Sequence, residues 1–180
     1  MIQLESRPEA SIQLHAAATD RTKPLLVAID ARLAWPGKPG VPPPPKVIPL
    51  TPAQQALFEK GRSLYGQICV LCHQPNGVGQ DGLAPPLVDS EWVLGSPERL
   101  ARILLHGLSG PILVNDRSYR MEMPALPGLS DEDIAAVLTY IRREWEHNAD
   151  AVSNQTVRKA REASKGRIQP WTAEELSALK

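Results

Sequence analysis

The residues best suited to chemistry stand together at positions 69–73, where the chain reads Cys-Val-Leu-Cys-His. Cys69 and Cys72 are the chain's 2 cysteines, and His73 directly follows the second. The pattern C-x-x-C-H is the attachment signature of a c-type haem, whose vinyl groups form thioethers with the two thiols. His73 then lies under the iron and donates one imidazole nitrogen. The alternative is a thioredoxin-like dithiol, which expects a preceding strand and a βαβ context, whereas a helical pattern precedes this motif.

An iron held in this way needs a second axial ligand or an open position, and four downstream side chains compete for that role. Met123 is followed by Pro124 in an extended loop, and proline fixes the backbone beside the thioether. Met121, two residues earlier, is the near rival. His106 and His147 would give bis-histidine ligation, although His106 stands at a predicted helix end, where it could instead cap the helix. We predict His73 and Met123 as the two metal ligands.

The composition is compatible with a small domain built around a porphyrin. Lys+Arg and Asp+Glu both number 20, so the net charge of zero offers no electrostatic case for nucleic-acid binding. Aromatic residues make up only 4% of the chain, and a flat apolar cofactor would supply part of the missing core. The longest apolar run, residues 25–29, is too short to span a bilayer.

The N-terminus carries no export signal, with neither a basic-then-apolar stretch nor a small-residue cleavage site. Bacterial c-type haem is attached outside the cytoplasm. We therefore expect a periplasmic or otherwise exported protein, of which this chain is a mature piece or a fragment of a longer polypeptide.

Three helices are predicted over residues 51–147, which we interpret as the haem domain. The first begins at a capping box, Thr51-Pro52-Ala53-Gln54, and runs into the cysteine motif. The second runs from Ser96-Pro97 to about His106, where Gly107 ends it. The third begins at Ser130 and carries an apolar stripe of helical period, made up of Ile134, Val137, Leu138, Ile141 and Trp145. The expected fold is mainly α, with three or more helices wrapped around a covalent haem.

Two extensions flank this domain. Residues 1–50 contain predicted helices over 9–18 and 23–34, although 11–14 alternate like a strand, and then a polyproline-like linker over 42–50. Residues 148–180 contain predicted helices over 153–164 and from Thr172, where Glu175 completes a capping box. This tail has too few large apolar residues for a core of its own, so we expect it to pack on the haem domain. Its basic run over 158–167 is interpreted as a solvated helix face, with a docking patch as the alternative.

Residues 61–69, Gly-Arg-Ser-Leu-Tyr-Gly-Gln-Ile-Cys, resemble the N-terminal helix of class I cytochromes c, and residues 138–141, Leu-Thr-Tyr-Ile, resemble the C-terminal helix that crosses it. The resemblance covers residues 53–146. It implies that Gly61 allows close contact between the two helices, so that Gly61 and Tyr65 meet Val137 and Tyr140.

The same resemblance implies several contacts to the haem. Residues 84–87, Ala-Pro-Pro-Leu, match a loop whose proline carbonyl accepts the ring N–H of the haem histidine, and we match Pro85 to that role. Such a bond orients the ligand and raises its basicity. Leu87, Trp92 and Arg102 are further candidate haem contacts. Possible donors to the haem propionates are Arg99, Arg102, Tyr119, Arg120 and Trp92.

A narrower likeness connects residues 35–40, 84–87, 105–108 and 166–172 with haem domains at the C-terminal end of large exported bacterial dehydrogenase-like proteins. It implies a redox protein or a dehydrogenase domain as the partner. It also implies that residues 1–34 are the last helical unit of a preceding repeat.

Three functions compete on these observations. The favoured one is one-electron transfer by one haem c per chain, in a protein that is not itself an enzyme. The second is a haem enzyme or gas sensor with an open or labile sixth position, for which His106 is the one candidate distal base. The third is a docking module of a larger exported assembly.

Overall fold

The computed structural model describes all residues except 1, 36, 39, 41–46 and 180. The chain divides into two compact units, residues 1–47 and residues 48–180. The polyproline-like linker predicted over 42–50 falls mainly on positions that lie outside the described residues.

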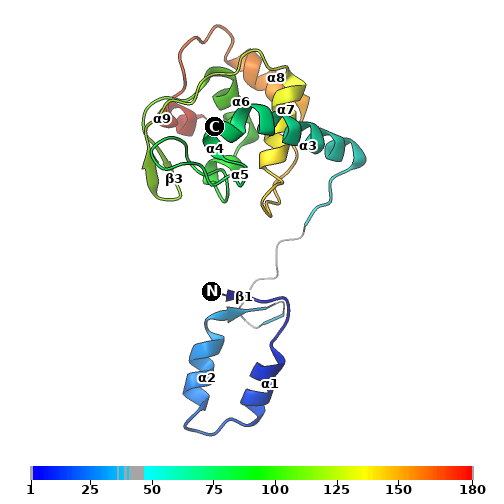
Figure 1. Cartoon of the computed structure of the whole chain (residues 1–180), viewed down its shortest axis with the longest axis vertical. Coiled ribbons are helices and arrows are strands. Elements are labelled where there is room, and N and C mark those ends of the chain that lie inside the picture. Colours follow the sequence, from blue (N-terminus) through cyan, green and yellow to red (C-terminus); the bar gives the residue numbers. More distant parts are fainter. Residues whose placement is uncertain (1, 36, 39, 41–46, 180) are drawn as a thin grey trace. The chain divides into compact units, whose positions relative to one another are not determined.

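The first unit pairs two short helices with two short strands (Figure 1). In sequence order, helices α1 (Glu9–Ala16) and α2 (Lys23–Asp30) come between strands β1 (Ile2–Gln3) and β2 (Leu33–Ala34). The two strands pair with each other in parallel. Both predicted helices exist, so the strand alternative for 11–14 is wrong. The second helix ends at Asp30 and not at residue 34, because Leu33 and Ala34 hydrogen-bond with β1 instead of extending it.

The second unit begins with a long helix that leads into the cysteine motif. Helix α3 (Pro52–Leu64) passes into a π-helical turn, η1 (Tyr65–Cys69), and then into α4 (Val70–His73). The predicted capping box is confirmed: the Gln54 amide donates to the Thr51 hydroxyl at 3.3 Å, and the Thr51 amide donates to the Gln54 side chain at 2.9 Å. This cap fixes the residue at which the helix begins.

Helix α7 (Asp131–Ile141) packs against α3 more extensively than any other pair of elements. The closest approach is at Gly61, where a Cβ atom would lie 2.0 Å from the Ala136 carbonyl oxygen and 2.9 Å from the Tyr140 Cβ. Gly61 thus meets Tyr140, as predicted, and Ala136 lies nearer still. The Tyr65 ring lies 5.2 Å from the Tyr140 ring.

Trp145 does not belong to this helix, contrary to the prediction. The helix ends at Ile141, and Trp145 has a positive φ of 54°. This turn directs its ring back against Tyr65 and Tyr140, with ring centroids 5.7 Å and 5.8 Å apart. The aromatic cluster therefore joins both helices to the segment that follows α7.

Two helices and a two-stranded hairpin lie between the motif and α7. Helix α6 (Pro97–His106) matches the prediction and ends at Gly107, which has a φ of 79°. Helix α5 (Glu91–Leu94) and the hairpin of β3 (Ile112–Val114) and β4 (Arg117–Tyr119) stand where no helix or strand was predicted. The hairpin turns at Asn115 and Asp116, whose φ values of 50° and 61° are those of a type I′ turn.

The C-terminal segment contributes to the same compact unit. Helix α8 (Asn154–Ala163) packs against α6 and α7, and Val157 and Ala160 lie in the main hydrophobic core. Helix α9 (Ala173–Ala178) places Leu176 in a smaller core beside Ile103 and Leu108. The second unit is therefore mainly helical, as predicted. Among the described residues, no helix combines the length and apolar character that crossing a bilayer requires.

Candidate functional site

His73 is held in the form that a metal ligand needs. The side chain is buried, and its Nδ1–H donates to the Pro85 carbonyl oxygen at 3.0 Å. This bond leaves Nε2 as the unprotonated nitrogen, which has no hydrogen-bond partner in the part of the chain that the structure describes. Burial lowers the pKa of His73, while the Pro85 carbonyl opposes this effect. A neutral imidazole fixed by a carbonyl is the usual arrangement of a ligating histidine.

The two cysteines are not joined to each other by a disulfide, and they differ in exposure. Cys72 is exposed, whereas Cys69 is half-buried, and burial together with the neighbouring Cys72 raises the pKa of Cys69 to about 11. A thiol–disulfide centre needs a thiol with a lowered pKa. Neither this pKa nor the helix in front of the motif suits a thioredoxin-like dithiol.

An apolar cavity of about 640 Å³, counted with its open mouth, lies beside His73. Its walls come from the motif, the following loop, α6, the β3–β4 hairpin, the Met123 loop and α7. Those walls are almost entirely aliphatic and aromatic, and they match the faces of a porphyrin, so the residues present fit a haem. The lining residues are Tyr65, Cys69, His73, Pro85, Pro86, Leu87, Ser90, Trp92, Val93, Leu100, Ile103, Leu104, Leu108, Ile112, Val114, Met123, Val137 and Ile141.

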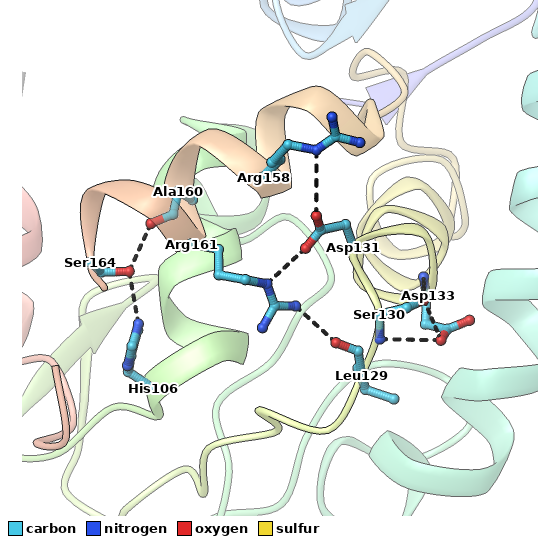
Figure 2. Close-up of polar contacts among 9 residues, drawn as sticks. All are labelled: His106, Leu129, Ser130, Asp131, Asp133, Arg158, Ala160, Arg161 and Ser164. Atoms are coloured by element: carbon cyan, nitrogen blue, oxygen red, sulfur yellow. Dashed lines mark hydrogen bonds and ion pairs between the residues drawn. The ribbon is translucent and has the colours of Figure 1, made fainter. Parts of the chain in front are cut away.

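Of the four side chains considered as second axial ligand, only Met123 lines this cavity. Met121 is 54% exposed. The His106 Nε2–H donates to the Ser164 hydroxyl at 2.7 Å, as Figure 2 shows. Both His147 nitrogens are engaged, because Nδ1–H donates to the Ile141 carbonyl at 2.8 Å and Nε2 accepts from the Asp89 amide at 2.9 Å.

The remaining predicted haem contacts divide into two groups. Pro85, Leu87 and Trp92 line the cavity. Arg102 does not: it borders a separate pocket, beside α9, with Arg99 and Leu179. Its position on α6 is beside the C-terminal segment, and its contact with a haem propionate stays a prediction.

The proposed propionate donors are also placed differently from one another. The Trp92 indole N–H donates to the Leu113 carbonyl at 2.8 Å, which occupies its one donor. Arg99 stacks on the Trp92 ring, 4.4 Å from its centroid. Tyr119 is buried in the smaller core, and Arg120 is exposed.

Several cavity residues were not anticipated as site residues. Ile103, Leu104 and Leu108 come from α6 and the residues after it, and Ile112 and Val114 come from the hairpin. The apolar face of α6 was visible in the sequence, but its partner could have been protein or cofactor. In β3, Ile112 and Val114 are buried and Leu113 is exposed, but all three are apolar, so the sequence itself carries no period-2 alternation that would have predicted this strand.

Comparison with known proteins agrees with this geometry. The family model described as "Cytochrome C oxidase, cbb3-type, subunit III" matches residues 56–141. Cytochrome c-552 of Thermus thermophilus is 37% identical over 124 residues, which cover 67% of this chain and 83% of that protein. The cytochrome c subunit of the quinone alcohol dehydrogenase of Gluconobacter oxydans is 31% identical over 104 residues, but these cover only 22% of that subunit.

These relatives establish the fold and the cofactor that the motif predicted. The helical unit has a cytochrome c fold, its cofactor is a covalently bound haem c with iron, and its activity is haem-based electron transfer, as in related electron carriers. The chain belongs to the cytochrome c family.

Proposed function

We propose that the chain is a one-electron carrier whose haem iron is held by His73 Nε2 and the Met123 sulfur. The observation that supports this ligand set most strongly is that Met123 lines the cavity while its three rivals are exposed or already bonded. When bound, the haem supplies the redox centre, and a histidine–methionine pair raises its potential. Both axial positions are then occupied, which suits a carrier better than an enzyme.

The chain's own residues orient the two proposed ligands and exclude water from the site. The Pro85 carbonyl fixes the His73 ring. The Met123 backbone is paired with Leu108 in both directions, at 2.9 Å and 3.0 Å, which limits movement of the thioether. Aliphatic walls exclude water, so little solvent has to reorganise when the charge of the site changes.

The alternative of a haem enzyme or gas sensor requires a distal base. His106 was the candidate for this role, but it does not line the cavity and its Nε2–H is bonded to Ser164. This arrangement argues for the carrier.

A dehydrogenase module or protein is the proposed electron donor, and the proposed location is the periplasm or another exported compartment. The similarity to the cytochrome c subunit of a quinone alcohol dehydrogenase supports the donor class. A docking role for the extensions within a larger assembly is compatible with this proposal.

The ligand assignment is tested by spectroscopy on the holoprotein. Wild-type ferric protein should show the weak near-infrared band of sulfur-to-iron charge transfer. Met123→Ala should abolish the band, lower the midpoint potential and admit carbon monoxide to the ferrous iron. Met121→Ala is the matched control and should change none of these. A band that persists in Met123→Ala would assign the ligand to Met121, and its absence from the wild type would contradict methionine ligation.

A further inference from the structure

The loop that carries Met123 is tied to α6 near its beginning. We define the axial loop as residues 120–130, between β4 and α7. In addition to the Met123–Leu108 pairing, the Leu126 amide donates to the Leu104 carbonyl at 2.8 Å. These bonds hold the first half of the loop, and its last residue, Ser130, bonds to Asp133 in the cap of α7.

Helix α8 also holds this end of the loop, through a single side chain. The Arg161 Nε–H donates to the Asp131 carboxylate at 2.8 Å, and one terminal N–H of the same guanidinium donates to the Leu129 carbonyl at 2.8 Å (Figure 2). Leu129 lies at the end of the axial loop, and Asp131 is the first residue of α7. One planar guanidinium therefore spans the junction between loop and helix, a two-point contact to which the fork of arginine is suited.

The same C-terminal segment also supports the other end of the loop. The Ser109 amide donates to the Trp171 carbonyl at 2.8 Å, and the Trp171 amide donates to the Gly107 carbonyl at 3.1 Å. Leu108 consequently lies between Met123 on one side and Trp171 on the other. Residues after 153 thus bond directly to the end of the axial loop and are connected to Met123 through Leu108.

We propose that Arg161 is a positioning residue for the sixth iron ligand: by fixing Leu129 and Asp131, it keeps the axial loop closed over the cavity. This inference rests on the proposed Met123 ligation. A neutral thioether binds iron weakly, so its retention depends on how often the loop opens. Local opening is governed by the contacts of the segment itself, and a preorganised loop loses less conformational entropy when its ligand binds.

The test measures displacement of Met123 by imidazole in the ferric holoprotein. Imidazole can bind only when the axial loop opens, so Arg161→Ala should bind it about tenfold more tightly than the wild type. Arg158→Ala is the matched control, because Arg158 lies on the same helix, 3.8 Å from the same carboxylate, but is 70% exposed and has no bond to the loop. Its affinity for imidazole should equal that of the wild type.

Two further measurements separate positioning from general stability. Arg161→Lys can keep the ion pair with Asp131 but lacks the fork that reaches Leu129, so it should be intermediate between Arg161→Ala and the wild type. Urea unfolding, followed by far-UV circular dichroism, should begin at urea concentrations well above those at which Arg161→Ala loses its near-infrared band. If Arg161→Ala does not yield holoprotein, the imidazole affinities of Arg161→Lys and Asp131→Asn test the same proposal.

The failures of the two proposals are distinguishable. A wild-type protein without the near-infrared band would overturn methionine ligation and this inference with it. A wild-type band together with equal imidazole affinities for Arg161→Ala and Arg158→Ala would overturn the inference alone. Loss of the band only in parallel with global unfolding would likewise overturn it.

Discussion

The crossing of α3 and α7 predicts a large effect from one added methyl group. In Gly61→Ala, the new Cβ would lie 2.0 Å from the Ala136 carbonyl oxygen and 2.5 Å from its carbon. Both are backbone atoms of a buried helix, so no side-chain rotation relieves the clash. Because non-bonded contacts are made at about 3.5 Å, the helices must separate by more than about 1 Å.

The free-energy cost of this separation comes from the aromatic contacts between the two helices. Moving them apart loosens the Phe58 and Tyr65 rings from Tyr140, which now lie 5.3 Å and 5.2 Å from it. Overpacking of this kind costs about 3 kcal/mol at the upper end of its range. The higher helix propensity of alanine returns about 1 kcal/mol. We therefore expect Gly61→Ala to lower the free energy of unfolding by about 2 kcal/mol.

Gly66 provides the matched control, because it lies five residues later along the same continuous helical run. A Cβ built there meets nothing within 4 Å, and its φ is not positive. Urea unfolding of the holoprotein, followed by far-UV circular dichroism, should find Gly66→Ala at least as stable as the wild type. If Gly61→Ala proved as stable as Gly66→Ala, the close crossing would not limit the packing of these helices.

Three other predictions follow from local contacts. Ser130→Ala removes the hydroxyl that caps α7 and should lower the free energy of unfolding by about 1 kcal/mol in urea titrations, and no change would contradict the cap. Hydrogen bonds from Lys60 and Ser130 hold the pKa of Asp133 below its ordinary value of 3.8. The stabilisation of the folded protein by these bonds is therefore fully present above pH 3.8, and it is lost as the pH falls through the lowered pKa of Asp133. Lys60→Met should therefore reduce the acid-dependent loss of stability by at most about 1 kcal/mol, since solvent screens the pair, and an unchanged pH profile would contradict this. Limited proteolysis should cut within 42–48 before it cuts after Trp145, and a folded fragment of residues 148–180 would contradict the expected packing of the tail.

The helices were predictable because their signals are local. The capping box at Thr51, the Ser-Pro start of α6 and the glycine at its end each act within one helical turn. Their boundaries could be read without knowledge of any tertiary contact. The cysteine motif is local for the same reason, since its spacing is set by the chemistry of one cofactor.

The features that were missed depend on partners distant in sequence or on an unusual turn. The pairing of β1 with β2 joins residues 2–3 to residues 33–34, and neither segment contains a local sequence signal that predicts this pairing. The β3–β4 hairpin turns at Asn115-Asp116, a less familiar type I′ pair than one that contains glycine. The pocket that Arg102 borders could not be predicted either, because a helical stripe does not reveal which neighbour each face contacts.

Met121 and Met123, the two candidate methionine ligands, differ in a non-local contact. An extended chain turns residues two apart toward the same side, so in the sequence only Pro124, which follows Met123, distinguishes the two thioethers. Leu108 distinguishes them further by pairing with Met123. That pairing requires Gly107, whose φ is 79° and whose Cβ would lie 2.5 Å from the Met123 carbonyl oxygen. The glycine that ends α6 thus also makes room for the axial loop, a second role that its sequence position could not reveal.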